Sequence, residues 1–135
     1  MKVCSHCKIE LPLGSFGQTV ATKSGYQYDC NKCRSEAGRR KRERDWKAIL
    51  LAYGGQCVHC EDTREEVLTL DHIGGGGNAH RRSLKKSAGS GFYAWVVLNN
   101  FPPFLRLLCF NCNCCLGVRG YLPRFNRIIE RREVA

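Results

Sequence analysis

The chain has 135 residues, which is enough for one compact domain or two very small ones. Its hydrophobic fraction of 43% includes ten cysteines, so the apolar core is small and needs a metal or disulfides to stabilise it. The net charge of +10 favours a polyanionic partner, and no apolar run approaches the length of a membrane span, which argues against a membrane protein.

Eight of the ten cysteines form four Cys-x-x-Cys pairs. Four thiolates make one closed tetrahedral zinc site, and a spacing of two residues suits the tight turn between two ligands. We therefore predict two structural Zn²⁺ ions per chain, which would lower the formal charge of +10 to about +6. Disulfides are the alternative, but no secretory signal precedes the first pair, so we expect a reducing cytoplasm and bound zinc. The pairs are Cys4/Cys7, Cys30/Cys33, Cys57/Cys60 and Cys109/Cys112.

The first half of the chain is predicted to contain a zinc module over residues 1–33 and a helix over 34–55. The module reads as turns and short strands, such as 26–28. The helix begins with a strongly basic stretch and ends with an apolar stripe and two glycines, Gly54 and Gly55, which are typical of a helix end. The stripe consists of Trp46, Ile49, Leu50 and Tyr53.

The second half is predicted to hold another zinc module over 56–117 and a C-terminal helix over 118–135. A strand over 67–70 leads to Asp71 and His72, and a glycine-rich stretch, 74–91, indicates a mobile loop. A helical segment near 92–99, a strand over 105–108 and a short helix from about 112 follow. The modules share only their cysteine spacing, so no repeat is predicted, and the whole is a small zinc-stabilised α+β protein.

The segments CVHC at 57–60, LTLDHI at 68–73 and LRLLCFNCN at 105–113 together resemble the HNH family of ββα-metal nucleases. The resemblance covers about half the chain. The N-terminal module and basic helix also resemble small two-zinc restriction and phage HNH nucleases. It implies a ββα-metal core and metal-dependent cleavage of double-stranded DNA in the cytoplasm of a prokaryote or a phage-infected cell. Asp71 and Asn113 would bind a catalytic Mg²⁺ or Mn²⁺, and His72 would be the general base.

These side chains suit that chemistry. A carboxylate and an amide oxygen can hold a hard cation while leaving most of its coordination to water and phosphate. A neutral imidazole can take the proton of the attacking water, since its ordinary pKa lies near 6.5. Adjacent strand residues point to opposite faces, so a bend after His72 would be needed for both side chains to serve one site. Pro103 and Phe104 stand where many HNH sequences have an asparagine, and Asn78, Asn99 and Asn100 are the candidates to replace it.

Basic side chains in the first helix and in the glycine-rich loop are predicted to contact DNA phosphates. The C-terminal arginines 124, 127, 131 and 132 are further candidates, whereas His80 is expected to be a solvated loop residue. Two alternatives remain: a non-catalytic zinc-containing DNA-binding regulator, and a zinc scaffold for protein interactions. Double-strand cutting would suggest a homodimer, and the choice among restriction, homing, packaging and junction resolution stays open. The predicted phosphate contacts are Arg39, Arg40, Lys41, Arg42, Arg81, Arg82, Lys85 and Lys86.

Overall fold

The computed structural model of the chain describes residues 1–84 and 90–122. Contacts divide the chain into two compact units, Met1–Arg44 and Asp45–Ala135. Within the described residues there are four α-helices and three two-stranded antiparallel sheets, which confirms the expected mixture of helices and strands. In the same residues, no helix combines the length and the apolar character that crossing a membrane requires.

The first unit is built from two small hairpins and the start of a helix. Strand β1 (Lys2–Val3) pairs with β2 (Glu10–Leu11), and β3 (Phe16–Gln18) pairs with β4 (Tyr26–Cys30). A short 3₁₀ turn, η1 (Leu13–Ser15), joins the hairpins. The core consists of Phe16 and three cysteines. Because so little apolar surface is buried, the stability of this unit depends on a link between its cysteines.

Helix α1 (Asn31–Ala52) begins earlier than the predicted start at residue 34, and Cys33 therefore lies in its first turn. It ends as predicted: Gly54 and Gly55 have φ values of 88° and 65°, and the Gly55 N–H donates to the Leu50 carbonyl at 2.7 Å. Left-handed backbone at a helix end favours glycine. The predicted apolar stripe is also confirmed, since Ile49 and Leu50 are buried in the second unit's core and Trp46 and Tyr53 pack against it.

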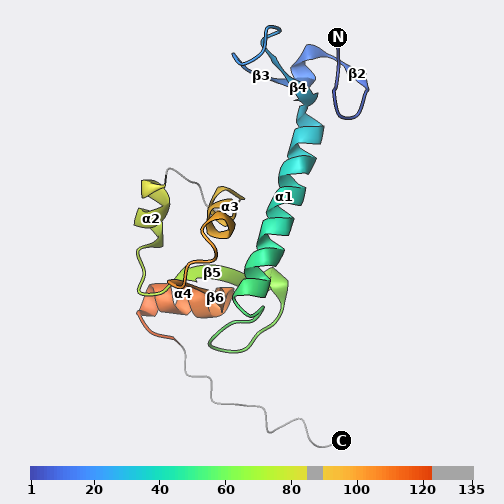
Figure 1. Cartoon of the computed structure of the whole chain (residues 1–135). Helices are drawn as coiled ribbons and strands as arrows, with labels where there is room; N and C mark the ends of the chain where they lie inside the picture. Colours follow the sequence, from blue (N-terminus) through green and yellow to red (C-terminus); the bar gives the residue numbers. More distant parts are fainter. Residues whose placement is uncertain (85–89, 123–135) are drawn as a thin grey trace, which may run out of the picture. The chain divides into compact units, whose positions relative to one another are not determined.

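The second unit is organised around a hairpin of β5 (Leu68–His72) and β6 (Leu105–Cys109), whose register pairs Leu68 with Cys109 and His72 with Leu105. The 3₁₀ turn η2 (Glu65–Val67) leads into β5. Helix α4 (Phe110–Arg119) follows β6 directly and contacts both strands, and α3 (Ser90–Leu98) packs on the other face of the hairpin (Figure 1). Alternate residues of each strand therefore face different helices.

Several boundaries differ from the predicted ones. The glycine-rich stretch contains helix α2 (Gly77–Ser83), so residues 77–83 are not a loop. Strand β5 begins one residue later than predicted, at Leu68, and Asp71 and His72 are its last two residues, at the strand end as expected. The helix predicted from about 112 starts at Phe110 and runs past 117 to Arg119, where Gly120 caps it with φ 73°. Of the predicted C-terminal helix, residues 123–135 lie outside the described part of the chain.

Candidate metal centres and active site

The eight paired cysteines gather into two clusters, as the sequence predicts. One contains Cys4, Cys7, Cys30 and Cys33, and the other Cys57, Cys60, Cys109 and Cys112. In each cluster all four sulfurs lie within 4.8 Å of one another, and all ten cysteines are free thiols. A tetrahedral zinc with bonds of about 2.3 Å would separate its sulfurs by about 3.8 Å. The observed 3.6 Å between the sulfurs of Cys60 and Cys109 fits that geometry.

The two clusters share a local backbone pattern that cysteine spacing alone does not predict. In each first pair, the residue after the second cysteine, Lys8 or Glu61, has a positive φ of 61° or 62°. Its N–H donates to the carbonyl of the first cysteine, at 3.0 Å for Cys4 and 2.9 Å for Cys57. The second pairs also match, since Cys30 and Cys109 each end a strand and their partners lie in the first turn of the next helix. An i, i+3 spacing places two sulfurs on one side of such a turn.

The clusters are electrostatically prepared for a cation. Burial opposes ionisation of Cys4, yet backbone N–H groups, including that of Cys30 at 3.2 Å from Sγ, lower its pKa to about 6. The pKa of Cys57 is likewise lowered to about 7, by N–H groups that outweigh burial. Burial and the neighbouring sulfurs raise the pKa of Cys33 to about 12 and push that of Cys112 higher still. A dication at the centre would stabilise all four thiolates, so both donor sets suit structural zinc.

The three residues predicted to form the active site lie around one hollow of the second unit. This hollow has a volume of about 380 Å³ and lies at the end of the β5–β6 hairpin, beside α4. Asp71 and His72 come from β5, and Asn113 from α4. The hollow is lined by Asp71, His72, Gly74, Gly75, Arg106, Asn113, Leu116, Gly117 and Gly120.

Asp71 is held by a cross-strand ion pair. It lies directly opposite Arg106, whose Nε donates to Oδ2 at 2.9 Å. The two side chains are 15% and 21% exposed, so water only partly screens their attraction. Arg106 was not among the predicted site residues, because its pairing with Asp71 depends on strand register.

Asn113 is oriented by a short chain of hydrogen bonds. Its Nδ2 donates to Thr69 Oγ1 at 2.9 Å, and that hydroxyl donates to the Leu108 carbonyl at 2.8 Å. Because the hydroxyl proton is used on Leu108, the hydroxyl must accept from Asn113. The amide nitrogen therefore faces Thr69, and the amide oxygen remains as the group that could bind a cation.

His72, the last residue of β5, leaves the opposite face of the strand from Asp71 but still lines the hollow, and it is only 8% exposed. Its ring stacks on Phe92, with centroids 5.5 Å apart, and its Nε2 lies 2.8 Å from Nδ1 of His80. Burial, and to a lesser extent the nearby charges of His80 and Arg81, lowers the pKa of His72, so the ring is neutral at pH 7. His80 is half-buried in α2 rather than a solvated loop residue, which corrects the sequence-based expectation.

Only some of the basic residues predicted to contact phosphates lie in the described part of the chain. Arg39, Arg40, Lys41 and Arg42 are all exposed on α1, where Arg39 also pairs with Glu43 at 3.9 Å. On α2, Arg82 is exposed, whereas Arg81 is half-buried and donates to Asn78. Lys85, Lys86 and the four C-terminal arginines lie outside the described residues.

Among the described residues, the side-chain hydrogen bonds of the candidate central asparagines are local to their own helices. Asn99 donates to the Trp95 carbonyl at 2.8 Å, and Asn78 accepts from Arg81. Asn100 has a positive φ of 53° in the turn after α3. The connection is instead tied by a backbone hydrogen bond of 2.9 Å from the Ile73 N–H to the Phe104 carbonyl.

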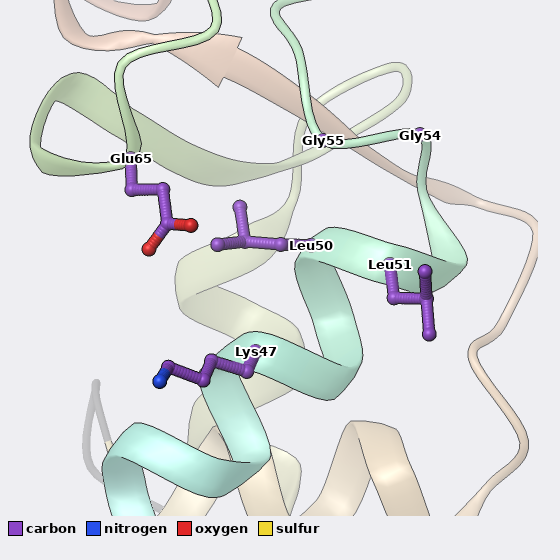
Figure 2. A pocket seen from close by; sticks show the side chains of 6 residues that line it. All are labelled: Lys47, Leu50, Leu51, Gly54, Gly55 and Glu65. Atoms are coloured by element: carbon purple, nitrogen blue, oxygen red, sulfur yellow. The ribbon is translucent and has the colours of Figure 1, made fainter.

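A second hollow, of about 390 Å³, lies at the C-terminal end of α1 and has no comparable chemistry (Figure 2). Lys47 and Glu65 project to the same side of it in Figure 2, and Leu51 projects away from them. Its lining combines apolar side chains with one charge of each sign and includes no histidine or cysteine. Of these two hollows, the one beside Asp71 therefore has the side chains suited to catalysis.

Comparison of the chain with protein-family models, with curated proteins and with solved structures gave no match.

Proposed function

We propose that this chain is a metal-dependent DNA endonuclease of the HNH type, with β5, β6 and α4 as its ββα-metal core. The observation that carries the proposal is the meeting of Asp71, His72 and Asn113 around one hollow. The sequence motifs alone predict these three residues, and they come from two elements, β5 and α4, between which α2 and α3 lie in the chain. The cysteine cluster at the base of the hairpin supports it, because β6 and α4 each contribute a sulfur.

In this proposal the oxygens of Asp71 and Asn113 hold one Mg²⁺ or Mn²⁺, and the two cysteine clusters hold zinc. The two groups proposed to bind this cation, a carboxylate and an amide, both offer oxygens, which suits a hard cation. The bound ion would stabilise charge on the phosphate and the leaving oxygen. His72 accepts the proton of the attacking water. Its lowered pKa keeps the imidazole neutral, as a proton acceptor must be. By the same resemblance, the products carry 5′-phosphate and 3′-hydroxyl ends.

Double-stranded DNA is the proposed substrate, and the basic side chains would bind its phosphates. Arg39, Arg40, Lys41 and Arg42 follow one another along α1, so they spread around a full turn and cannot all face the protein. Their exposure supports a role in phosphate binding, which adds affinity without base specificity.

A second candidate function is a zinc-containing DNA-binding protein without catalytic activity. The ion pair between Asp71 and Arg106 favours it, because the guanidinium already neutralises the carboxylate that a cation would need. The two functions share their zinc sites and their basic helix. They differ in whether the hollow binds Mg²⁺ and cleaves DNA.

Nicking of supercoiled plasmid separates the two functions. The full chain should nick DNA with Mg²⁺ or Mn²⁺ and not with EDTA, and His72→Ala should lower the rate by at least about a hundredfold. Because His72 is buried, the variant should also lose about 2 kcal/mol of stability. Val96→Ala is the matched control, since it truncates another buried side chain, which packs in the same unit, and should keep cleavage. A wild-type chain that binds DNA without nicking it would favour the non-catalytic function.

A further inference from the structure

Two histidines eight residues apart form a hydrogen-bonded pair in the second unit. His72 in β5 and His80 in α2 approach with Nε2 and Nδ1 2.8 Å apart. Three consecutive glycines with positive φ, at positions 74–76, turn the chain back between them. The β5 strand end and helix α2 are thus brought together by a turn that only glycines adopt readily.

The pair is enclosed by aromatic rings on several sides. His80 packs edge-on against Trp95 and Phe104, with centroid distances of 4.8 and 5.6 Å. Phe92 stacks on His72 and also meets the His80 ring edge-on. Such packing leaves each imidazole few alternative rotamers, so the hydrogen bond between them is held in place.

The surroundings of Nδ1 indicate which nitrogen of His72 carries the proton. A methyl group added to Gly77 would lie 2.8 Å from Nδ1, so a side chain at this position would cover that edge of the ring and glycine leaves it uncovered. Among the described residues, no hydrogen-bond acceptor meets Nδ1, whereas Nε2 faces His80. A proton on Nε2 would be satisfied by His80 Nδ1, while a proton on Nδ1 would have no acceptor in the described part of the chain.

We propose that His80 is a positioning residue that holds His72 in the Nε2–H tautomer and leaves Nδ1 as the proton acceptor. The functional part rests on the proposed role of His72 as general base. His80 accepts from Nε2–H through its own Nδ1 and carries its proton on Nε2. A second-layer group that fixes a tautomer in this way commonly contributes about 10- to 100-fold to the activity of its partner.

Two substitutions separate the hydrogen bond from the packing. His80→Phe keeps an aromatic ring against Trp95 and Phe104 but removes the acceptor. His80→Asn places an amide oxygen near the position of Nδ1 and can restore it. Ser83→Ala is the control, because it removes only the bond from Ser83 Oγ to the His80 carbonyl, of 2.7 Å, from the same helix.

The first readout is the ¹⁵N NMR spectrum of the imidazoles in the full zinc-loaded chain, at a pH where both rings are neutral. We expect His72 to be the Nε2–H tautomer in the wild type, Ser83→Ala and His80→Asn, and a mixture in His80→Phe. A wild-type His72 protonated on Nδ1, or an unchanged tautomer in His80→Phe, would overturn the inference. This readout needs no nuclease activity, so it stands even if the proposed function fails.

The second readout is plasmid cleavage by the same four proteins. His80→Phe should lower kcat at least tenfold with KM unchanged, and His80→Asn should recover most of the loss. Equal kcat in the wild type and His80→Phe would show that the pair has no catalytic role. A wild type that does not cleave at all contradicts the proposed function, and the tautomer of His72 then decides the structural part of the inference alone.

Discussion

Arg106 and Asp71 face each other across the β5–β6 hairpin, with the guanidinium Nε donating to the carboxylate Oδ2 at 2.9 Å. If Asp71 is a metal ligand, an arriving cation has to compete with this pair. Arg106 also lines the hollow, so the guanidinium that cancels the charge of Asp71 lies where a phosphate would enter. The ion pair is therefore expected to weaken cation binding in the protein without DNA.

Arg106→Gln should strengthen the binding of Mn²⁺ to the zinc-loaded chain. An ion pair of this kind contributes about 1 kcal/mol, so the dissociation constant should fall roughly fivefold. Titration of Mn²⁺, followed by its effect on water proton relaxation, measures this without DNA. Arg64→Gln is the matched control, because Arg64 pairs with Asp62 at 3.0 Å away from the hollow. If Arg106→Gln and Arg64→Gln bound Mn²⁺ with equal affinity, Asp71 would not be a ligand of the cation.

Thr69→Val should weaken Mn²⁺ binding by about tenfold, although Thr69 does not line the hollow. The substitution keeps the shape of the side chain but leaves Asn113 Nδ2 without its acceptor, so the amide can rotate away. It should also cost about 1 kcal/mol of stability, because the bond to the Leu108 carbonyl is lost. Thr69→Ser retains the hydroxyl and should bind as the wild type does. A full effect in Thr69→Ser would indicate that packing, and not the hydroxyl, is responsible.

Sequence spacing was enough to predict the parts of the structure that depend on local geometry. Cysteines three residues apart can bind one ion whether they lie in a turn or in the first turn of a helix, so both clusters were predicted although the helix starts were not. The end of α1 was predicted for the same reason, because Gly54 and Gly55 act on their own backbone. The alternation of β5 likewise indicated that Asp71 and His72 would point to different faces.

The contacts that could not be predicted from the sequence depend on strand register and on a short helix. Arg106 meets Asp71 only in one of several registers of β5 and β6. Helix α2 has seven residues and follows three glycines. Its sequence has too few turns to show a helical period, so the pattern predicted a loop. His80 was therefore expected in solvent, and its contact with His72 was missed.

Zinc analysis of cysteine variants tests the two clusters separately. The wild type should contain two zinc ions per chain, and both should survive mild EDTA, which would remove a catalytic Mg²⁺. Cys57→Ser should retain one zinc and lose the folded core of the second unit, because the metal supplies folding free energy there. Cys4→Ser should also retain one zinc but keep that core, as reported by the NMR signals of its aromatic rings.

Cys114→Ser is the control for these variants, because Cys114 is exposed and belongs to neither cluster. It should retain both zinc ions and the wild-type spectrum. One zinc ion or none in the wild type, or disulfides detected by mass spectrometry, would contradict the assignment of the clusters.

Replacement of the basic run on α1 tests the proposed DNA contact. Arg39, Arg40, Lys41 and Arg42 are all exposed, and about three of them can face a duplex at once. Changing all four to Ala in the His72→Ala background should flatten the slope of log K against log salt by roughly 3 units. Affinity should fall equally on all DNA sequences, since phosphate contacts carry no base information.

The matched control for the basic run replaces Arg39, Arg40 and Arg42 with Lys, which keeps every charge and changes only the head groups. Its salt slope should equal that of the parent, because the slope counts neutralised phosphates and not the kind of cation. A loss confined to one DNA sequence in this control would mean that an arginine also reads base edges, where lysine cannot reproduce its bidentate geometry. An unchanged slope in the Ala variant would instead show that α1 does not dock on DNA.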